Sequence, residues 1–181
     1  YMVEADTLLK SGDVSRSLAA LNDAIQKYPE QADLYFARSL LQEQLGNIQA
    51  AETDLRFVLA RQPENADALN ALGYTLVDRT PRAEEGYVLI QKAHKLAPND
   101  SFILDSMGWV LFRTGRYTES VQYLSRAYGK FPDPEVAAHL GEALWFKGDK
   151  DGAMAVWQGA LLREPGHPIL LDTLDRLGID A

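Results

Sequence analysis

The stretch "DSMGWVLFRTGRY", residues 105–117, decides how the rest of the chain is interpreted. Its apolar residues follow helical spacing, yet Gly108 lies inside the expected helix and Gly115 follows seven residues later. A glycine inside a helix costs about 1 kcal/mol relative to alanine, because glycine loses more backbone freedom on folding. We therefore expect a neighbouring segment to need the space that the missing side chain leaves.

The positions of proline and glycine show a repeat of about 34 residues along the whole chain. Successive prolines are separated by 34, 35, 34 and 33 residues, at Pro29, Pro63, Pro98, Pro132 and Pro165. Four glycines each precede one of these prolines by 17 residues, namely Gly12, Gly46, Gly115 and Gly148. In the third unit the segment Arg79-Thr80-Pro81-Arg82 replaces the glycine turn. The sequence therefore predicts an array of five related units.

Each unit predicts two helices. The glycine suits a residue of positive φ just past the first helix, and the proline ends the second helix because it lacks an N–H. Between them the apolar residues have helical spacing, as in Leu104, Met107 and Leu111, then Tyr117, Val121 and Leu124. No segment has the alternation of a strand. We predict an all-α fold.

The positions equivalent to Gly108 explain why it is small. They are occupied by Ala5, Ser39, Gly73 and Gly141. Twelve or thirteen residues later a second series is also small, at Ser17, Ala51, Gly86, Ser120 and Ala153. We predict that the paired helices cross at these two series. A third series, expected where one repeat packs on the next, is Ala24, Val58, Ala93, Ala127 and Ala160.

This pattern resembles the tetratricopeptide repeat (TPR) family. The fourth unit carries the family's pattern as Leu104, Met107-Gly108, Leu111, Gly115, Tyr117, Ser120, Leu124, Ala127 and Pro132. The resemblance implies a right-handed superhelical solenoid, with repeats at about 1–31, 32–65, 66–100, 101–134 and 135–167. The chain departs from the family pattern at Glu4, Arg38 and Gln42, where Leu or an aromatic residue is usual.

The two ends of the chain differ. Residues 168–181 predict a capping helix, with Asp172, Asp175 and Arg176 turned to water and one apolar face made of Leu170, Leu171, Leu174 and Leu177. The first helix begins at Tyr1 with no corresponding cap. We expect the chain to be a fragment of a longer protein, with any targeting signal or lipid anchor before Tyr1.

The composition argues against several classes of function. The net charge of −8 disfavours a nucleic-acid partner, and no apolar run reaches the ~20 residues of a membrane span. The three histidines, His94, His139 and His167, fall at different positions of the repeat, so they predict no shared metal site. The segment Asp149-Lys150-Asp151-Gly152 favours a turn into a helix over a calcium loop. We expect no enzyme and no cofactor.

The resemblance to TPR proteins implies that the first helix of each repeat lines a concave, partner-binding face. Carried over to this chain, the contact positions are Phe36, Asp67, Asn70, Tyr74, Asp78, Phe102, Asp105, Trp109, Phe112, Arg113, Glu142, Trp145 and Phe146. The aromatic residues among them resemble the anchors of a recognition surface, but an aromatic residue in a helix pair is more often core. Whether Trp109, Phe112 and Trp145 line the groove stays open at this point, whereas Trp157 is expected in the core.

The charges at the carried-over positions suggest a preference for one kind of partner. With Asp33 and Glu43 included, they comprise six acids and one base, Arg113. The Lys, Asn and Arg set with which chaperone-tail-binding members of the family clamp a carboxylate is absent. We therefore expect the groove to prefer an apolar segment with basic or neutral flanks.

The function predicted from these features is that of a non-enzymatic adaptor that binds a protein or peptide. The strings "ALNALGYTLVDRT" and "ILDSMGWVLFRTGRY" resemble the carboxy-terminal repeats of proteobacterial outer-membrane TPR lipoproteins, one of which presents substrates to a periplasmic carboxy-terminal processing protease. This resemblance implies a location on the periplasmic side of the outer membrane, with the cytoplasm left open. The alternatives are a structural or self-associating segment of a longer solenoid, or the regulatory TPR region of a larger enzyme.

Overall fold

The structure, a computed structural model, describes residues 2–179, although the side chains of residues 2, 5 and 6 lie outside that description. Over this range the chain forms eleven α-helices and no strand, as predicted. The helices are α1 (Met2–Lys10), α2 (Val14–Lys27), α3 (Ala32–Gln44), α4 (Ile48–Arg61), α5 (Ala66–Arg79), α6 (Ala83–Leu96), α7 (Ser101–Arg113), α8 (Tyr117–Lys130), α9 (Pro134–Lys147), α10 (Lys150–Arg163) and α11 (Pro168–Leu177).

The helix boundaries follow from local sequence chemistry. Four glycines between paired helices have φ from 75° to 99°, which confirms the predicted turns at Gly12, Gly46, Gly115 and Gly148. The repeating prolines each lie two residues beyond the end of α2, α4, α6, α8 or α10. Several helices begin with an acidic or amide side chain that accepts a backbone N–H, as Asp149 does from Gly152. The Asp149 segment is therefore the predicted turn into a helix.

Gly108 lies where α7 crosses α8. A Cβ atom at Gly108 would overlap the side chain of Leu124, and one at Gly141 would overlap the indole of Trp157. The Ser120 hydroxyl donates a hydrogen bond of 2.7 Å to the carbonyl oxygen of Gly108 across the same crossing. The predicted close approach of the paired helices is confirmed at these positions, whereas the Ala5 side chain lies outside the described part of the chain.

The third small series lies between repeats. Ala127 of α8 is buried in one cluster with Leu104 of α7 and Val136 of α9, so it joins the fourth repeat to the fifth. All five members of the series are buried, at Ala24, Val58, Ala93, Ala127 and Ala160. Small residues here let each helix pair approach the next.

Arg38, which departs from the apolar family pattern, has a specific partner. Its Nε and Nη2 atoms each donate to Asp54 at 2.7 Å, and Nη1 donates to the Asn22 side-chain oxygen at 2.8 Å. The Asp54 side chain is 5% exposed. The bidentate pair therefore joins α3 to α4 within the second repeat, and the bond to Asn22 of α2 extends it to the first repeat.

Helix α11 caps the fifth repeat with a narrower apolar face than predicted. Leu170 and Leu174 are buried in one cluster with Trp157, and Leu177 packs at its border. Leu171, in contrast, is 40% exposed, so its assignment to the covering face was wrong. Residues 170, 174 and 177 share one helical stripe, whereas residue 171 is rotated about 100° from residue 170.

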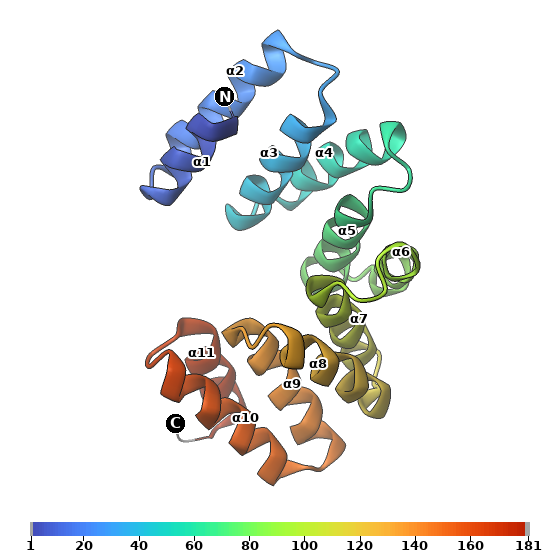
Figure 1. Cartoon of the computed structure of the whole chain (residues 1–181), viewed down its shortest axis with the longest axis vertical. Helices are drawn as coiled ribbons and strands as arrows, with labels where there is room; N and C mark the ends of the chain where they lie inside the picture. The colour runs from blue at the N-terminus through green and yellow to red at the C-terminus, as the bar shows by residue number, and fades with distance from the viewer. Residues whose placement is uncertain (1, 180–181) are drawn as a thin grey trace.

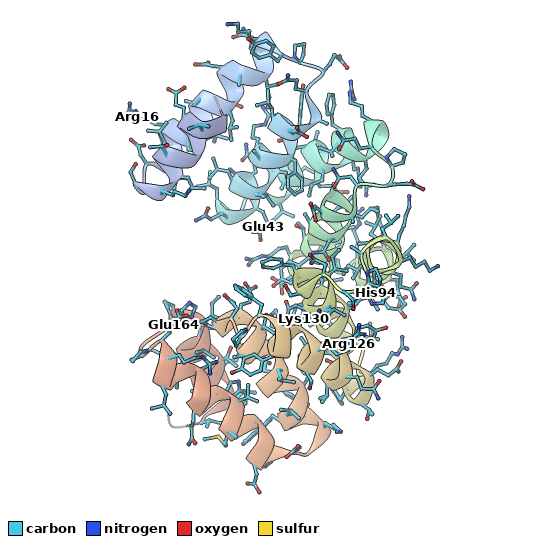
Figure 2. All side chains as sticks on the ribbon, in the orientation of Figure 1. Arg16, Glu43, His94, Arg126, Lys130 and Glu164 are labelled. Atoms are coloured by element: carbon cyan, nitrogen blue, oxygen red, sulfur yellow. The ribbon has the colours of Figure 1, made fainter. Side chains whose placement is uncertain are left out.

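The helix pairs follow a curved path, with α5 to α7 at the bend and α1 and α11 on the same side (Figure 1). The odd-numbered helices from α3 to α11 contact one another in succession, which places them on the inner side of the curve. Figure 2 shows Glu43 of α3 on this inner side, with His94 and Arg126 on the outer side. The inner helices therefore form the face on which the predicted contact positions lie.

Candidate functional site

The inner face contains a hollow of about 350 Å³ between repeats three, four and five and the capping helix. Helices α5, α7, α9 and α11 each contribute to it. We call this site the inner hollow. It is lined by Asp78, Trp109, Phe112, Arg113, Glu142, Phe146 and Arg176. Six of these seven are positions predicted from the sequence, and only Arg176 was not.

Stacked rings form one wall of the inner hollow. The indole of Trp109 stacks between His139, with ring centroids 4.1 Å apart, and Phe112, with centroids 5.0 Å apart. Phe146 meets Phe112 edge-on at 5.5 Å. Trp109 is 8% exposed and Phe146 is 49% exposed, so burial falls along the wall from His139 to Phe146. Phe146 is the ring most open to a ligand.

Asp78 connects the third repeat to this wall. Its Oδ1 atom accepts a hydrogen bond from Trp109 Nε1 at 3.2 Å and lies 3.4 Å from Arg113 Nη1. Its Oδ2 atom lies 3.2 Å from Arg79 Nε. Asp78 thereby fixes the orientation of the indole and lies against two guanidinium groups.

Two further acids among the predicted contact positions are also paired. Glu142 accepts from both terminal nitrogens of Arg176, at 3.0 and 2.7 Å. Asp105 lies 3.0 and 3.1 Å from His139 Nδ1 through its two oxygens. The placement of these acids does not support the expectation that they attract a basic segment, and Arg176 does not simply face water as expected.

The Asp105–His139 pair is buried beneath the indole of Trp109. Burial lowers the pKa of His139, but the charge and hydrogen bond of Asp105, with the charges of Glu135 and Glu142, outweigh it and raise the pKa above its ordinary value. The protonated imidazole is therefore favoured in the folded protein, where it ties α7 to α9.

Tyr74 links the third repeat to the fifth. Its hydroxyl donates a hydrogen bond of 2.9 Å to Glu135 Oε1 at the start of α9. Burial, together with the charge of Glu135, raises the pKa of Tyr74, so the phenol stays neutral and keeps its proton for this bond. Of the two other predicted positions on α5, Asp67 is exposed and Asn70 is partly buried.

Besides Tyr74, three of the predicted aromatic positions lie outside the inner hollow. Phe36 packs against the core shared by repeats two and three. Trp145 packs against the C-terminal core, with its ring 6.0 Å from Trp157, which is fully buried as expected. Phe102 is 62% exposed beside Phe131, 5.7 Å between ring centroids. Of the three rings left open by the sequence, Trp109 and Phe112 line the hollow and Trp145 does not.

Sequence reasoning missed His139 and Arg176 as components of this site. The repeat register could have predicted part of the site. Asp78 and Arg113 occupy equivalent positions of neighbouring repeats, 35 residues apart, and their side chains are in contact. Trp109 and Glu142 likewise each follow a crossing glycine. No register predicts Arg176, because α11 lies outside the repeats.

The chemistry of the inner hollow is that of contact and hydrogen bonding. Within the described residues, no group of three or more His, Cys, Asp or Glu side chains could hold a metal ion. No helix in the described range is both long and apolar enough to cross a membrane. What the hollow offers is aromatic surface bordered by two guanidinium groups.

Two curated proteins illustrate the sequence similarity. A TPR repeat-containing protein of Pseudomonas aeruginosa is 49% identical over 142 residues, which cover 78% of this chain and 24% of that protein. Bacteriophage adsorption protein A of Escherichia coli is 34% identical over 93 residues, covering 50% of this chain and 9% of that protein. The chain thus spans only a small part of the length of these relatives.

Solved structures and family comparison agree on the architecture. A thermophilic TPR protein from Thermus thermophilus matches with a TM-score of 0.81 at 19% identity, over 97% of this chain and 96% of that one. YrrB, described as a TPR protein with an unusual peptide-binding site, matches with a TM-score of 0.64 at 20% identity, over 94% and 88%. The tetratricopeptide repeat family matches residues 2–55, 36–100 and 106–168. The chain therefore belongs to the tetratricopeptide repeat family and folds as its right-handed superhelical solenoid.

Proposed function

We propose that this protein is a non-enzymatic scaffold that binds a segment of a partner protein in the inner hollow. TPR proteins act as protein-interaction scaffolds, and the observation that carries the proposal here is the exposed ring of Phe146 beside Phe112 in a concave site. Large aromatic side chains at the edge of a hollow are typical anchors of recognition surfaces.

The size of the inner hollow limits what it holds. Its volume of about 350 Å³ is near the lower end of the roughly 300–1,000 Å³ range typical of ligand pockets. It therefore accepts a few side chains of a segment and not a folded domain. The rest of such a segment lies along the inner helices, where Asp67 and Asn70 of α5 are predicted contacts.

The finer proposal is a periplasmic adaptor. The chain would belong to an outer-membrane lipoprotein, on its periplasmic side, and would present substrates to a carboxy-terminal processing protease. Its support is the resemblance of residues 68–80 and 103–117 to the carboxy-terminal repeats of such lipoproteins, and these two stretches contain Asp78, Trp109, Phe112 and Arg113 of the hollow.

Site-specific photocrosslinking tests the proposal. A photoreactive phenylalanine analogue replaces Phe146 in the hollow, and in a matched protein it replaces Leu162, which is 83% exposed on α10. After incubation with a bacterial periplasmic extract, we expect adducts from position 146 to be several-fold more abundant than those from position 162. The additional substitution Phe112→Ser should reduce the yield of the position-146 adducts. Equal yields from both positions would contradict the scaffold role of the hollow.

The same adducts test the adaptor role. Mass spectrometry of the position-146 adducts should identify a carboxy-terminal processing protease or proteins that it cleaves. If specific adducts form but contain neither, the adaptor role is wrong while the scaffold role stands.

A further inference from the structure

The ion pairs at the inner hollow share an arrangement that bears on partner choice. In the Glu142–Arg176 pair the carboxylate side chain is 3% exposed and the guanidinium side chain is 53% exposed. In the Asp78–Arg113 pair the corresponding values are 21% and 39%. In both pairs the acid lies deeper than the base, so the charge that a ligand meets first is positive.

The two arginines have guanidinium N–H donors that their ion pairs do not use. Arg113 contacts Asp78 through Nη1 alone, at 3.4 Å, while Arg176 uses Nη1 and Nη2 on Glu142. Because a guanidinium group has five N–H donors, each arginine can also bind an acceptor on a ligand. Asp78, moreover, lies against Arg79 as well as Arg113, so its single charge is shared.

The acids elsewhere do not reverse this local balance. Asp105 is paired with His139 beneath the wall. Asp172 on α11 acts on Arg176, which leaves the Arg113 side of the hollow with the smaller opposing charge. The other acids behind the net charge of −8 are distributed over all the repeats and the capping segment, and none of those in the described part of the chain lines the inner hollow. Those that lie farther away than the screening length of about 8 Å at physiological salt contribute little.

We infer that the inner hollow selects an internal segment in which an aliphatic or aromatic anchor is flanked by Asp or Glu side chains. The anchor packs on Phe112 and Phe146, and the flanking carboxylates accept hydrogen bonds from Arg113 and Arg176. Charge-assisted bonds of this kind are stronger than neutral ones. This inference rests on the proposed function and reverses the preference for basic flanks that the sequence suggested.

Selection from a random library tests the charge preference without a known partner. Dodecapeptides are displayed on phage with their carboxyl ends fused to the coat protein, so that only internal segments are offered. They are selected for binding to the wild-type protein, and those that also bind the Phe146→Ser variant are removed. Among the clones that depend on the hollow, we expect Asp and Glu beside the apolar anchor to be several-fold enriched over the starting library. The enrichment should vanish with Arg113→Gln but persist with Arg126→Gln, a matched change on α8.

The outcomes separate the inference from the proposed function. Hollow-dependent clones with basic flanks, or with no charge bias, would overturn the inference and leave the scaffold role standing. If no clone depends on the hollow, both fail. Because Arg176→Gln alone would leave Glu142 buried and unpaired, the second arginine is tested with Arg176→Gln and Glu142→Gln together, and all variants are first compared by circular dichroism and melting temperature.

A synthetic peptide identifies the source of the carboxylate. The peptide of the best clone is synthesised with an acetylated amino end and an amidated carboxyl end. It is titrated into the protein by calorimetry, and so is a neutral version in which Asn and Gln replace Asp and Glu. We expect the neutral version to bind at least about tenfold more weakly, the loss typical of a charged hydrogen bond. If a free carboxyl terminus on the neutral version restores the affinity, the ligand is a chain end, and the assignment to an internal segment is overturned.

Discussion

Gly108 occupies a position at which even one methyl group has no room, because Leu124 of the paired helix fills the space. We predict that Gly108→Ala lowers the free energy of unfolding by about 1–3 kcal/mol through overpacking. Gly129→Ala, on α8 with nothing within 4 Å of the added atom, is the matched control and should be neutral or slightly stabilising. Urea unfolding followed by far-UV circular dichroism checks both, and equal midpoints would contradict the predicted crossing.

His139 should make stability depend on pH in a defined direction. Its folded-state pKa is raised above the ordinary 6.5, so its contribution is fully present below pH 6.5 and is lost as pH rises through the folded pKa. The melting temperature of the wild type minus that of His139→Gln should therefore be largest below pH 6.5 and shrink as the pH is raised above it. Asp105→Asn should remove most of this dependence. A constant difference across the range would show that Asp105, Glu135 and Glu142 do not hold the charge.

Individual residues differ in how far the sequence predicts them. Gly108 is predictable because close helix approach excludes every large side chain, and the same constraint recurs in each repeat. Glu142 is not, because an acid at an inner position looks the same in the sequence whether it faces water or a guanidinium group. Its burial depends on Arg176 of α11, whose placement follows only from three-dimensional packing.

At the scale of the helices, α11 covers the end of the fifth repeat. Leu174 is 2% exposed and packs on the fifth repeat, whereas Leu171 is 40% exposed. Leu174→Ala should cost about 2–5 kcal/mol by leaving a cavity, and Leu171→Ala should change stability by about 0.5 kcal/mol or less. Thermal unfolding of the two variants is the comparison. Similar melting temperatures would show that α11 does not cover the repeat.

Removing α11 tests the cap as an element. A protein ending at residue 167 exposes the surface that Leu170 and Leu174 cover, and it also leaves Glu142 without Arg176. We expect aggregation in analytical ultracentrifugation and a lower melting temperature. A monomeric truncated protein with unchanged stability would contradict the capping role.

The elements as a class were accessible to sequence reasoning. Positive-φ glycine and helix-ending proline are local constraints, so each boundary follows from a few neighbouring residues. The predicted buried face of α11 was partly wrong, because its four leucines within eight residues span more than one helical stripe. Which stripe is buried depends on the surface opposite, and the sequence of α11 does not contain that surface.

At the scale of the molecule, burial in the inner helices increases toward the carboxyl end of the solenoid. Four of thirteen residues are buried in α3, seven of fourteen in α5, nine of thirteen in α7 and ten of fourteen in α9. The links from Tyr74 to Glu135 and from Asp105 to His139 join the inner helices of repeats three to five. The inner hollow thus lies on the most tightly packed part of the chain, as a preformed recognition site requires.

This distribution predicts the order in which the solenoid opens. Apart from the Tyr74–Glu135 link, each repeat contacts mainly its neighbours, so local stability follows local burial. In native-state hydrogen exchange, amides of α1 and α2 should exchange fastest, and those in the centres of α7 and α9 should exchange slowest, with protection factors at least about tenfold higher. Breaking the Asp105–His139 pair with His139→Gln should lower protection in α7 and α9 and leave α2 unchanged. Uniform protection along the chain, or equal loss in α2, would show that the repeats unfold as one unit and that the inner face has no separate rigidity.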